Sequence, residues 1–246
     1  MEVHAHTHTP RKKWTHYLWE FLMLFLAVFC GFLAENQREH LVEKQREKQF
    51  IKSIIIDLSQ DTVALNRLIE DYAKKGKELD SLMILLNTPN IQEKGTSIYL
   101  KGRSAPRIQY FTPIDRTILQ MKNSGGFRLI RNDSASTSIL DYYASINFLE
   151  LLKSINSQQA ETYRIYSTDI FDPMILEKMI ANNADSITTP EGNPKLLTYD
   201  KKQLTRLTGA IHYYNSTRRA LGTYCLSQKK AAISLIYFLK KEYYIK

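Results

Sequence analysis

The sequence predicts an all-α protein, in which an N-terminal transmembrane helix continues into an extracytoplasmic bundle of three long helices plus one or two short ones. Three observations favour this fold class. Apolar residues recur every seven positions from Ile51 onward, the 246 residues include only 9 Gly and 7 Pro, and a long apolar run lies near the N-terminus. A seven-residue apolar period is typical of bundle and coiled-coil helices, and few Gly and Pro residues leave few breaks in them.

The apolar run at residues 17–34 has the composition of a membrane anchor. Its 18 positions hold one charge, Glu20, and a basic triplet at positions 11–13 precedes it. A bilayer core about 30 Å thick requires about 20 mostly apolar residues in a helix. We therefore expect three parts: a cytoplasmic tail at 1–13, a transmembrane anchor at 14–34 and the bundle domain at 35–246.

A cleaved secretory signal is the alternative, because a basic start and an apolar stretch also fit that description. The small-x-small cleavage site of such a signal is missing. Cutting after Ala34 places Phe32 at the third position back, and cutting after Gly31 places Phe29 there. The bulky Phe29 before Cys30 also argues against a lipoprotein site. The retained anchor is the preferred interpretation, and the cleaved signal stays open.

Charge predicts the orientation of the anchor. The basic triplet precedes the span, whereas residues 35–39 hold two Glu and one Arg. The positive-inside rule then places the N-terminus in the cytoplasm and the rest of the chain outside the inner (plasma) membrane, with a single pass. Trp14, Tyr17 and Trp19 cluster at the cytoplasmic boundary, where amphipathic rings favour the headgroup layer.

Glu20 is the one carboxylate inside the predicted span. It lies about one turn inside the boundary and four residues after His16, so it can reach headgroup water or pair along the helix. A polar contact between associating spans is the other interpretation. The position favours the first.

The tract after the anchor carries the strongest helical signal. Its leading column recurs every seven residues without a miss: Ile51, Leu58, Leu65, Tyr72, Leu79 and Leu86. The intermediate positions are Ile54, Leu68 and Leu82, with polar interruptions at Asp61 and Lys75. Residues 35–49 lack Gly and Pro and are rich in good helix formers, so we expect one helix to run from the anchor to Leu86.

Residues 87–133 separate this tract from the next. Residues 91–111 contain scattered Gly and short apolar runs, which favours a loop with a β-hairpin. The Thr-Pro-Ile-Asp segment at 112–115 has the composition of a helix start and predicts a short helix through Met121. Gly125 and Gly126 end that helix.

Two more long helices are predicted. Asn132 offers the N-cap of a helix of about ten turns, whose apolar face comprises Ile139, Tyr143, Ile146, Leu152, Ile155, Tyr163, Tyr166 and Ile170. Pro173 ends or kinks it. Asp200 and Gln203 form a capping pair for the last helix, whose column, interrupted by Arg218 and Gln228, comprises Leu204, Leu207, Ile211, Tyr214, Leu221, Leu235 and Leu239. Up-down-up connectivity would carry the C-terminus away from the membrane.

The net charge of +9 comes from the end of the chain. Residues 195–246 hold 11 Lys and Arg against 2 Asp and Glu, whereas residues 35–194 hold 20 against 21. A basic helix can bind an acidic partner, anionic lipid or nucleic acid, and the expected export disfavours nucleic acid. We predict a partner surface for an acidic protein or envelope polymer, with anionic lipid as the less favoured alternative, at Arg218, Arg219, Lys229, Lys230, Lys240 and Lys241. Membrane lipid contacts the anchor, and a protein partner or a second copy of the chain is expected.

No catalytic template is present: the chain has no G-x-S-x-G, H-E-x-x-H, P-loop or dinucleotide fingerprint. We therefore predict no catalytic residue, no cofactor and no enzyme. His4, His6 and His8 alternate in the tail and are weak metal-ligand candidates, since alternating imidazoles can share a divalent ion but here lack a scaffold. Two cysteines far apart, Cys30 and Cys225, exclude a disulfide framework.

Several segments resemble an uncharacterised family of small inner-membrane proteins of Bacteroidetes-type bacteria, a domain of unknown function. The similar features are Trp19-Glu20-Phe21 in the span, a charged helix with Asp57-Leu58 and Asp61, and the stretch from Ser124 to Asn132 followed by Tyr142-Tyr143. The match covers about the first 150 residues. The resemblance implies a membrane-anchored helical protein and carries no catalytic residue across.

These observations favour a structural or interaction protein of the cell envelope, which scaffolds or recruits partners through its bundle. The alternative is a ligand-sensing bundle, which requires a pocket between helices and a partner to pass the signal inward. Thirteen residues before Trp14 are too few for an output domain. An enzyme comes third, because it would need a convergent cluster of titratable residues.

Overall fold

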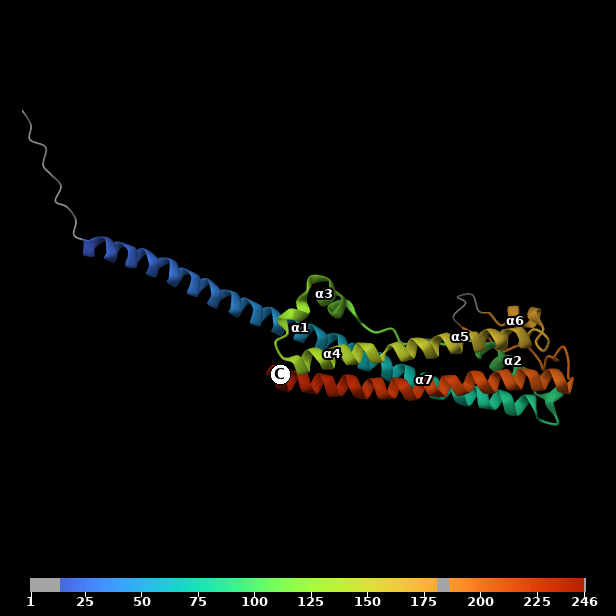
Figure 1. Cartoon of the computed structure of the whole chain (residues 1–246). Coiled ribbons are helices and arrows are strands. Elements are labelled where there is room, and N and C mark those ends of the chain that lie inside the picture. The colour runs from blue at the N-terminus through green and yellow to red at the C-terminus, as the bar shows by residue number, and fades with distance from the viewer. Residues whose placement is uncertain (1–13, 181–185, 246) are drawn as a thin grey trace, which may run out of the picture. The chain divides into compact units, whose positions relative to one another are not determined.

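The computed structural model describes residues 14–180 and 186–245, which form two compact units, one ending at Phe50 and one beginning at Ile51 (Figure 1). The described residues are all-α and contain no named strand, so the predicted fold class is confirmed. The elements are α1 (Trp14–Leu86), η1 (Ile91–Glu93), α2 (Gly95–Ser104), α3 (Arg116–Ser124), η2 (Gly126–Leu129), α4 (Asp133–Ser145), α5 (Asn147–Ser167), α6 (Pro173–Lys178) and α7 (Lys201–Glu242).

The first unit consists of the N-terminal part of α1. Its apolar side chains are exposed along the whole predicted span, from Trp14 to Leu33. Among the described residues, α1 is the one helix long and apolar enough to cross a membrane. The pairing predicted for the carboxylate in the span is confirmed, because Oε1 of Glu20 lies 2.9 Å from Nε2 of His16. The compact bundle begins at Ile51, so residues 35–50 group with the span rather than with the bundle.

The second unit is a bundle of three long tracts: α1 from Ile51 onward, α4 followed by α5, and α7 (Figure 1). α1 and α7 are antiparallel. Near the start of the bundle, Lys229 donates to Asn66, and farther along α1 the amide of Asn215 donates to the carbonyl of Gly76. Residue numbers therefore rise along one helix as they fall along the other.

The α4–α5 tract also runs antiparallel to α7. Ser145 donates to Gln228, and Asn156 donates to the carbonyl of Tyr214. α1 and the α4–α5 tract are consequently parallel, and residues 87–132 return the chain to the Ile51 end of the bundle. The expected up-down-up connectivity is wrong, because α7 also ends there, beside the start of α4 (Figure 1).

The columns expected from the sequence form the core. All six heptad residues of α1 from Ile51 to Leu86 are at most 2 % exposed, and the corresponding column of α7 is buried as well. Burying each such side chain contributes about 1.5 to 3 kcal/mol relative to leaving it exposed. The polar interruptions Asp61, Arg218 and Gln228 are buried too, so the interior has polar layers.

Residues 91–104 differ from the sequence prediction. They form η1 and α2 rather than a β-hairpin, because the two glycines serve close packing rather than turns. A Cβ on Gly102 would lie 2.3 Å from the ring of Phe171, and one on Gly95 would lie 1.9 Å from the carbonyl oxygen of Pro194. α2 thereby closes the Leu86 end of the bundle together with α6 and the start of α7.

Two helix boundaries also differ. α3 begins at Arg116, not in the Thr-Pro segment before it, because the N–H of Ile114 is bound to a side chain of α1. The single ten-turn helix is two helices that meet at Ile146. The carbonyl of Tyr142 accepts from the side chains of Ser145 and Gln228, which displaces the normal main-chain bond and breaks the helix.

Candidate functional site

Two buried aspartates of α1, one turn apart, bind the segment that leads into α3. Asp57 accepts hydrogen bonds from Nε of Arg116 (2.8 Å), from the N–H of Thr117 (3.4 Å) and from the Thr117 hydroxyl. Asp61 accepts from the N–H of Ile114 and from the phenol of Tyr142, both at 2.9 Å. Both aspartates are 0 % exposed. We call this group the aspartate latch.

The two carboxylates of the latch have different electrostatic surroundings. Asp57 is paired with a cation, whereas Asp61 has only neutral donors. Burial raises the pKa of Asp61 to about 6; the bonds from Ile114 and Tyr142 oppose the rise, and the nearby charges of Asp57 and Asp115 add to it. Burial also raises the pKa of the Tyr142 phenol well above its usual range. Asp61 is thus a carboxyl group that titrates near neutral pH.

The latch can hold and release one proton, but its other groups do not suit nucleophilic or metal chemistry. In the described residues no group of three or more His, Cys, Asp or Glu side chains is placed to hold a metal ion. Asp61 and Tyr142 face each other inside the bundle; Asp61 is 0 % exposed, whereas Tyr142 is 4 % exposed and also lines a groove between α4 and α7. The latch therefore joins α1, α4 and the segment before α3. Sequence reasoning treated Asp61 as an interruption of the apolar column and as part of the family resemblance, and assigned its side chain no partner.

Arg218 does not belong to a partner surface, contrary to the sequence prediction. It is 0 % exposed. Its Nη2 donates to the carbonyl of Ala105 (3.1 Å) and to the hydroxyl of Tyr214 (2.6 Å), and its guanidinium carbon lies 4.6 Å from the centre of the Tyr214 ring. Nε and Nη1 are buried without a hydrogen-bond partner. A cation–π contact with the Tyr214 ring thus offsets only part of the cost of burying this cation.

The remaining residues of the predicted basic surface divide into two groups. Arg219 makes two bonds of 2.6 Å to the carboxylate of Asp80, and Lys229 donates to Asn66, so both hold α7 against α1. Lys230 and Lys241 are exposed and Lys240 is half-buried. These three, together with Arg219, which is exposed although it is paired, are the members of the predicted surface that lie at the surface of the bundle.

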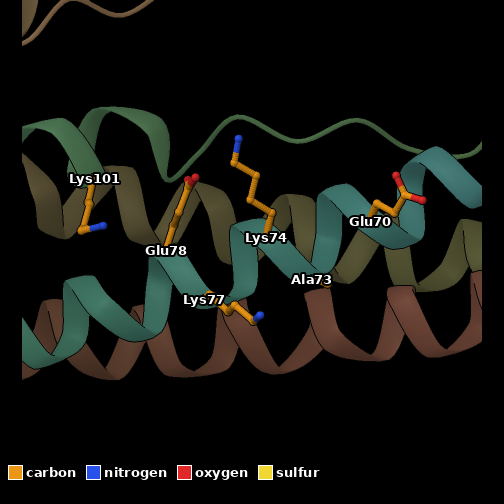
Figure 2. A pocket seen from close by; sticks show the side chains of 6 residues that line it. All are labelled: Glu70, Ala73, Lys74, Lys77, Glu78 and Lys101. Carbon is orange, nitrogen blue, oxygen red and sulfur yellow. The ribbon is translucent and has the colours of Figure 1, made fainter.

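An open groove of about 530 Å³ lies along α1 beside α2, and Figure 2 shows the side chains that line it. Its lining mixes both charges: Glu70, Ala73, Lys74, Lys77, Glu78 and Lys101. The lysine ammonium groups point in different directions rather than toward a common point (Figure 2), and Glu78 is already bound by Lys75 and Ser104. This arrangement resembles a solvated helix surface more than a site for an anion.

A second groove, of about 420 Å³, lies between α4 and α7 and is mainly apolar. It is lined by Ser138, Asp141, Tyr142, Ser145, Ala231, Ser234, Leu235 and Phe238. Next to it the rings of Phe148 on α5 and Tyr224 on α7 lie 4.4 Å apart, and both are more than 40 % exposed. Leu151 and Ile155 continue the exposed apolar row on α5.

These residues make up one continuous side of the bundle, which we call the α5–α7 face: Phe148, Leu151 and Ile155 on α5, with Ala220, Tyr224, Ser227, Ala231 and Ser234 on α7. Sequence reasoning missed it. The signal that could have found it is the pair of α7 columns at 210, 217, 224, 231, 238 and at 213, 220, 227, 234, which contain no charge in a chain that is 24 % charged.

The histidines of the tail, His4, His6 and His8, lie outside the described residues. The aromatic residues predicted at the membrane boundary, Trp14, Tyr17 and Trp19, are exposed on α1. No family model, no curated protein and no solved structure matches the chain.

Proposed function

We propose that the protein is a membrane-anchored interaction protein of the cell envelope that recruits or scaffolds partners through its bundle. The observation that carries this proposal is the α5–α7 face. It presents exposed aromatic and aliphatic side chains, Phe148, Leu151 and Tyr224 among them, without a charge on the α7 columns beside them. Contiguous exposed apolar surface with a polar surround is typical of protein interaction sites.

Membrane anchoring is supported by the exposed apolar side chains of α1 before residue 35. The charge difference across the span supports a cytoplasmic N-terminus and a bundle on the outer side of the inner membrane. The resemblance to single-span inner-membrane proteins supports the same location. No cofactor is needed for this function.

Site-specific crosslinking in native membranes tests the proposal. A photoreactive residue at Leu151 would lie on the α5–α7 face, and one at Lys74, exposed on α1, is the matched control. We expect discrete crosslinked bands with defined partners at Leu151 and few or none at Lys74. Equal crosslinking at both positions, or none at Leu151, would contradict recruitment through this face.

A further inference from the structure

A second apolar surface lies on the side of α7 that faces α1. Leu226 and Ile233 are seven residues apart and continue the helical column of Arg219, which binds Asp80 of α1. Both side chains are nonetheless more than 40 % exposed. The groove between the two helices therefore keeps apolar side chains at the surface.

α1 contributes a matching column. Ile56 and Val63 are also seven residues apart, and both are about half exposed. Lys229 donates to Asn66 at 2.6 Å, which sets the level of the two helices. Because the helices are antiparallel, the next turn of α7 carries Ile233 to the level of Val63. We call this surface the α1–α7 face: Ile56 and Val63 on α1, with Leu226, Ile233 and the exposed Tyr237 on α7.

The charges around the α1–α7 face are almost all positive. Residues 52–70 of α1 and 226–241 of α7 contain one exposed carboxylate, Glu70, which already accepts from Asn66. The other two carboxylates of these segments, Asp57 and Asp61, are buried in the aspartate latch. The cations at the surface of the same segments are Lys52, Arg67, Lys230, Lys240 and Lys241. The face thus combines an apolar centre with a basic surround.

We propose that the α1–α7 face binds an acidic amphipathic helix of a partner protein. The apolar side chains of that helix lie along the groove between α1 and α7, and its Asp and Glu residues lie beside Lys52, Lys230 and Lys240. From Leu226 to Lys240 the groove extends about 21 Å, since a helix rises about 1.5 Å per residue, so the bound helix has about four turns. This partner is additional to the one proposed for the α5–α7 face.

The charge of the face disfavours a second copy of this chain as the occupant. In a symmetric contact each surface meets its own copy, so the cations around the groove would oppose one another. Like-charge opposition across an interface costs several kcal/mol. The face is therefore complementary to an acidic surface and not to itself.

The spacing of the apolar residues favours a helix over a lipid surface. Ile56 and Val63 repeat at the same seven-residue interval as the α7 column, and this interval lets a third helix pack its side chains into the spaces between two others. A lipid surface binds through apolar area and basic charge without a fixed period. The two columns also lie at matching levels on neighbouring helices, as a packed helix requires.

A designed peptide tests the chemistry of the face. The probe is a fluorescent peptide of three heptads, with Leu at positions a and d and Glu at positions e and g. Fluorescence anisotropy measures its binding to the full chain in nanodiscs of zwitterionic lipid, and we expect a dissociation constant of about 10 μM or less. The same peptide with Lys at e and g should bind at least about tenfold more weakly. Equal binding of both peptides, or no binding of the Glu peptide at about 100 μM, would overturn the proposal.

Two matched substitutions locate the binding. Ile233→Glu places a carboxylate in the centre of the groove and should weaken binding of the Glu peptide at least about tenfold. Ile84→Glu is the control, because it continues the α1 column of Ile56 and Val63 beyond the face and is 70 % exposed. It should change binding by less than about twofold. Equal losses for the two variants, with helicity unchanged by circular dichroism, would place the peptide elsewhere.

Charge reversal tests the complementarity itself. The double variant Lys52→Glu with Lys230→Glu should weaken binding of the Glu peptide at least about tenfold and should strengthen binding of the Lys peptide. Loss of both peptides, with helicity unchanged, would show that charge does not select the partner.

Photocrosslinking from position 233 in native membranes distinguishes the occupants. We expect adducts with a second protein that the double charge reversal abolishes, while adducts from Leu151 on the α5–α7 face stay. Adducts with lipid, or with another copy of the chain, would overturn the partner helix. If position 233 gives the expected adducts and Leu151 gives none, the proposed function fails and the α1–α7 face stands.

Discussion

The phenol of Tyr142 donates a 2.9 Å hydrogen bond to Asp61, and both side chains are buried at the contact between α1 and α4. The same carboxylate accepts from the N–H of Ile114, 53 residues away in the sequence. A single ionisable group thus fixes two separate segments onto α1.

The stability of the bundle should depend on pH through Asp61. Its folded pKa is about 6 against 3.8 in the unfolded chain. Between these values the folded state binds more protons, so this contribution to stability is fully present below pH 3.8 and is lost as pH rises through 6. The total is roughly 3 kcal/mol. Urea unfolding at pH 4.5 and pH 7.5 should show about 2 kcal/mol of this total, because pH 4.5 still lies above the unfolded pKa.

The variant Asp61→Asn isolates this contribution. Its amide oxygen can accept from Ile114 and its NH₂ can donate to the Tyr142 oxygen, so it imitates the protonated acid. We expect Asp61→Asn to be more stable than wild type at pH 7.5, with the difference shrinking toward pH 4.5. A constant difference between the two proteins at all pH values would show that Asp61 does not titrate in this range.

The apolar column of α1 should tolerate no charge. Leu65 is 0 % exposed, so Leu65→Asp buries an unpaired carboxylate and should cost roughly 4 kcal/mol. Leu58→Asp should behave in the same way. Lys74→Ala, on the exposed side of the same helix, should change stability by less than about 0.5 kcal/mol. Thermal unfolding compares the stability of the three variants. Similar melting temperatures for all three would mean that the column lies outside the core.

Arg218→Met should be at least as stable as wild type. The guanidinium is fully buried, with two nitrogens that lack partners, and replacing buried charge by an apolar side chain of similar size is often neutral or stabilising by about 1 to 4 kcal/mol. Arg218→Ala, in contrast, leaves a cavity and should be destabilised by about 2 kcal/mol or more. Chemical unfolding distinguishes the two. A large loss for Arg218→Met would show that the bonds to Ala105 and Tyr214 outweigh the desolvation of the charge.

The orientation of the chain can be measured with a single cysteine. Ser186 is exposed in the bundle unit, and Cys225 is buried, so Ser186→Cys in a Cys30→Ser background gives one reactive thiol. A membrane-impermeant maleimide should label it in intact spheroplasts. Labelling only after lysis would mean that residue 186 lies in the cytoplasm, which contradicts the predicted orientation. A mature protein that begins after Ala34 would show that residues 1–34 are a cleaved signal rather than a retained anchor.

The helices and the apolar core could be predicted from periodicity, because columns such as Ile51 to Leu86 indicate which side of each helix is buried. Chain direction does not follow from periodicity. The parallel arrangement of α1 and α5 depends on the latch, where Asp57 and Asp61 hold the returning segment, and such long-range bonds between polar residues have no local signal. The same reason explains why a buried Arg218 looked like a member of a basic surface.

Two glycines were interpreted wrongly as turn residues. Gly95 and Gly102 suggested turns, since glycine usually marks turns in sequence. In the fold they lie inside or at the start of α2, where Pro194 and Phe171 occupy the space of a Cβ. Only the neighbouring elements, 69 to 99 residues later in the chain, reveal that requirement. The α5–α7 face, in contrast, was readable from the sequence as two uncharged columns.

The parallel course of α1 and α5 also sets an order of assembly. Asn156 on α5 meets Tyr214 across 58 residues, whereas Gly76 on α1 meets Asn215 across 139. Closing the shorter loop costs less entropy, so the α5–α7 hairpin can form before α1 joins it. Until the final helix is complete, the column from Ile51 to Leu86 lacks the side chains of α7 that share its core, and a chain shortened at its C-terminus leaves part of that core unfilled.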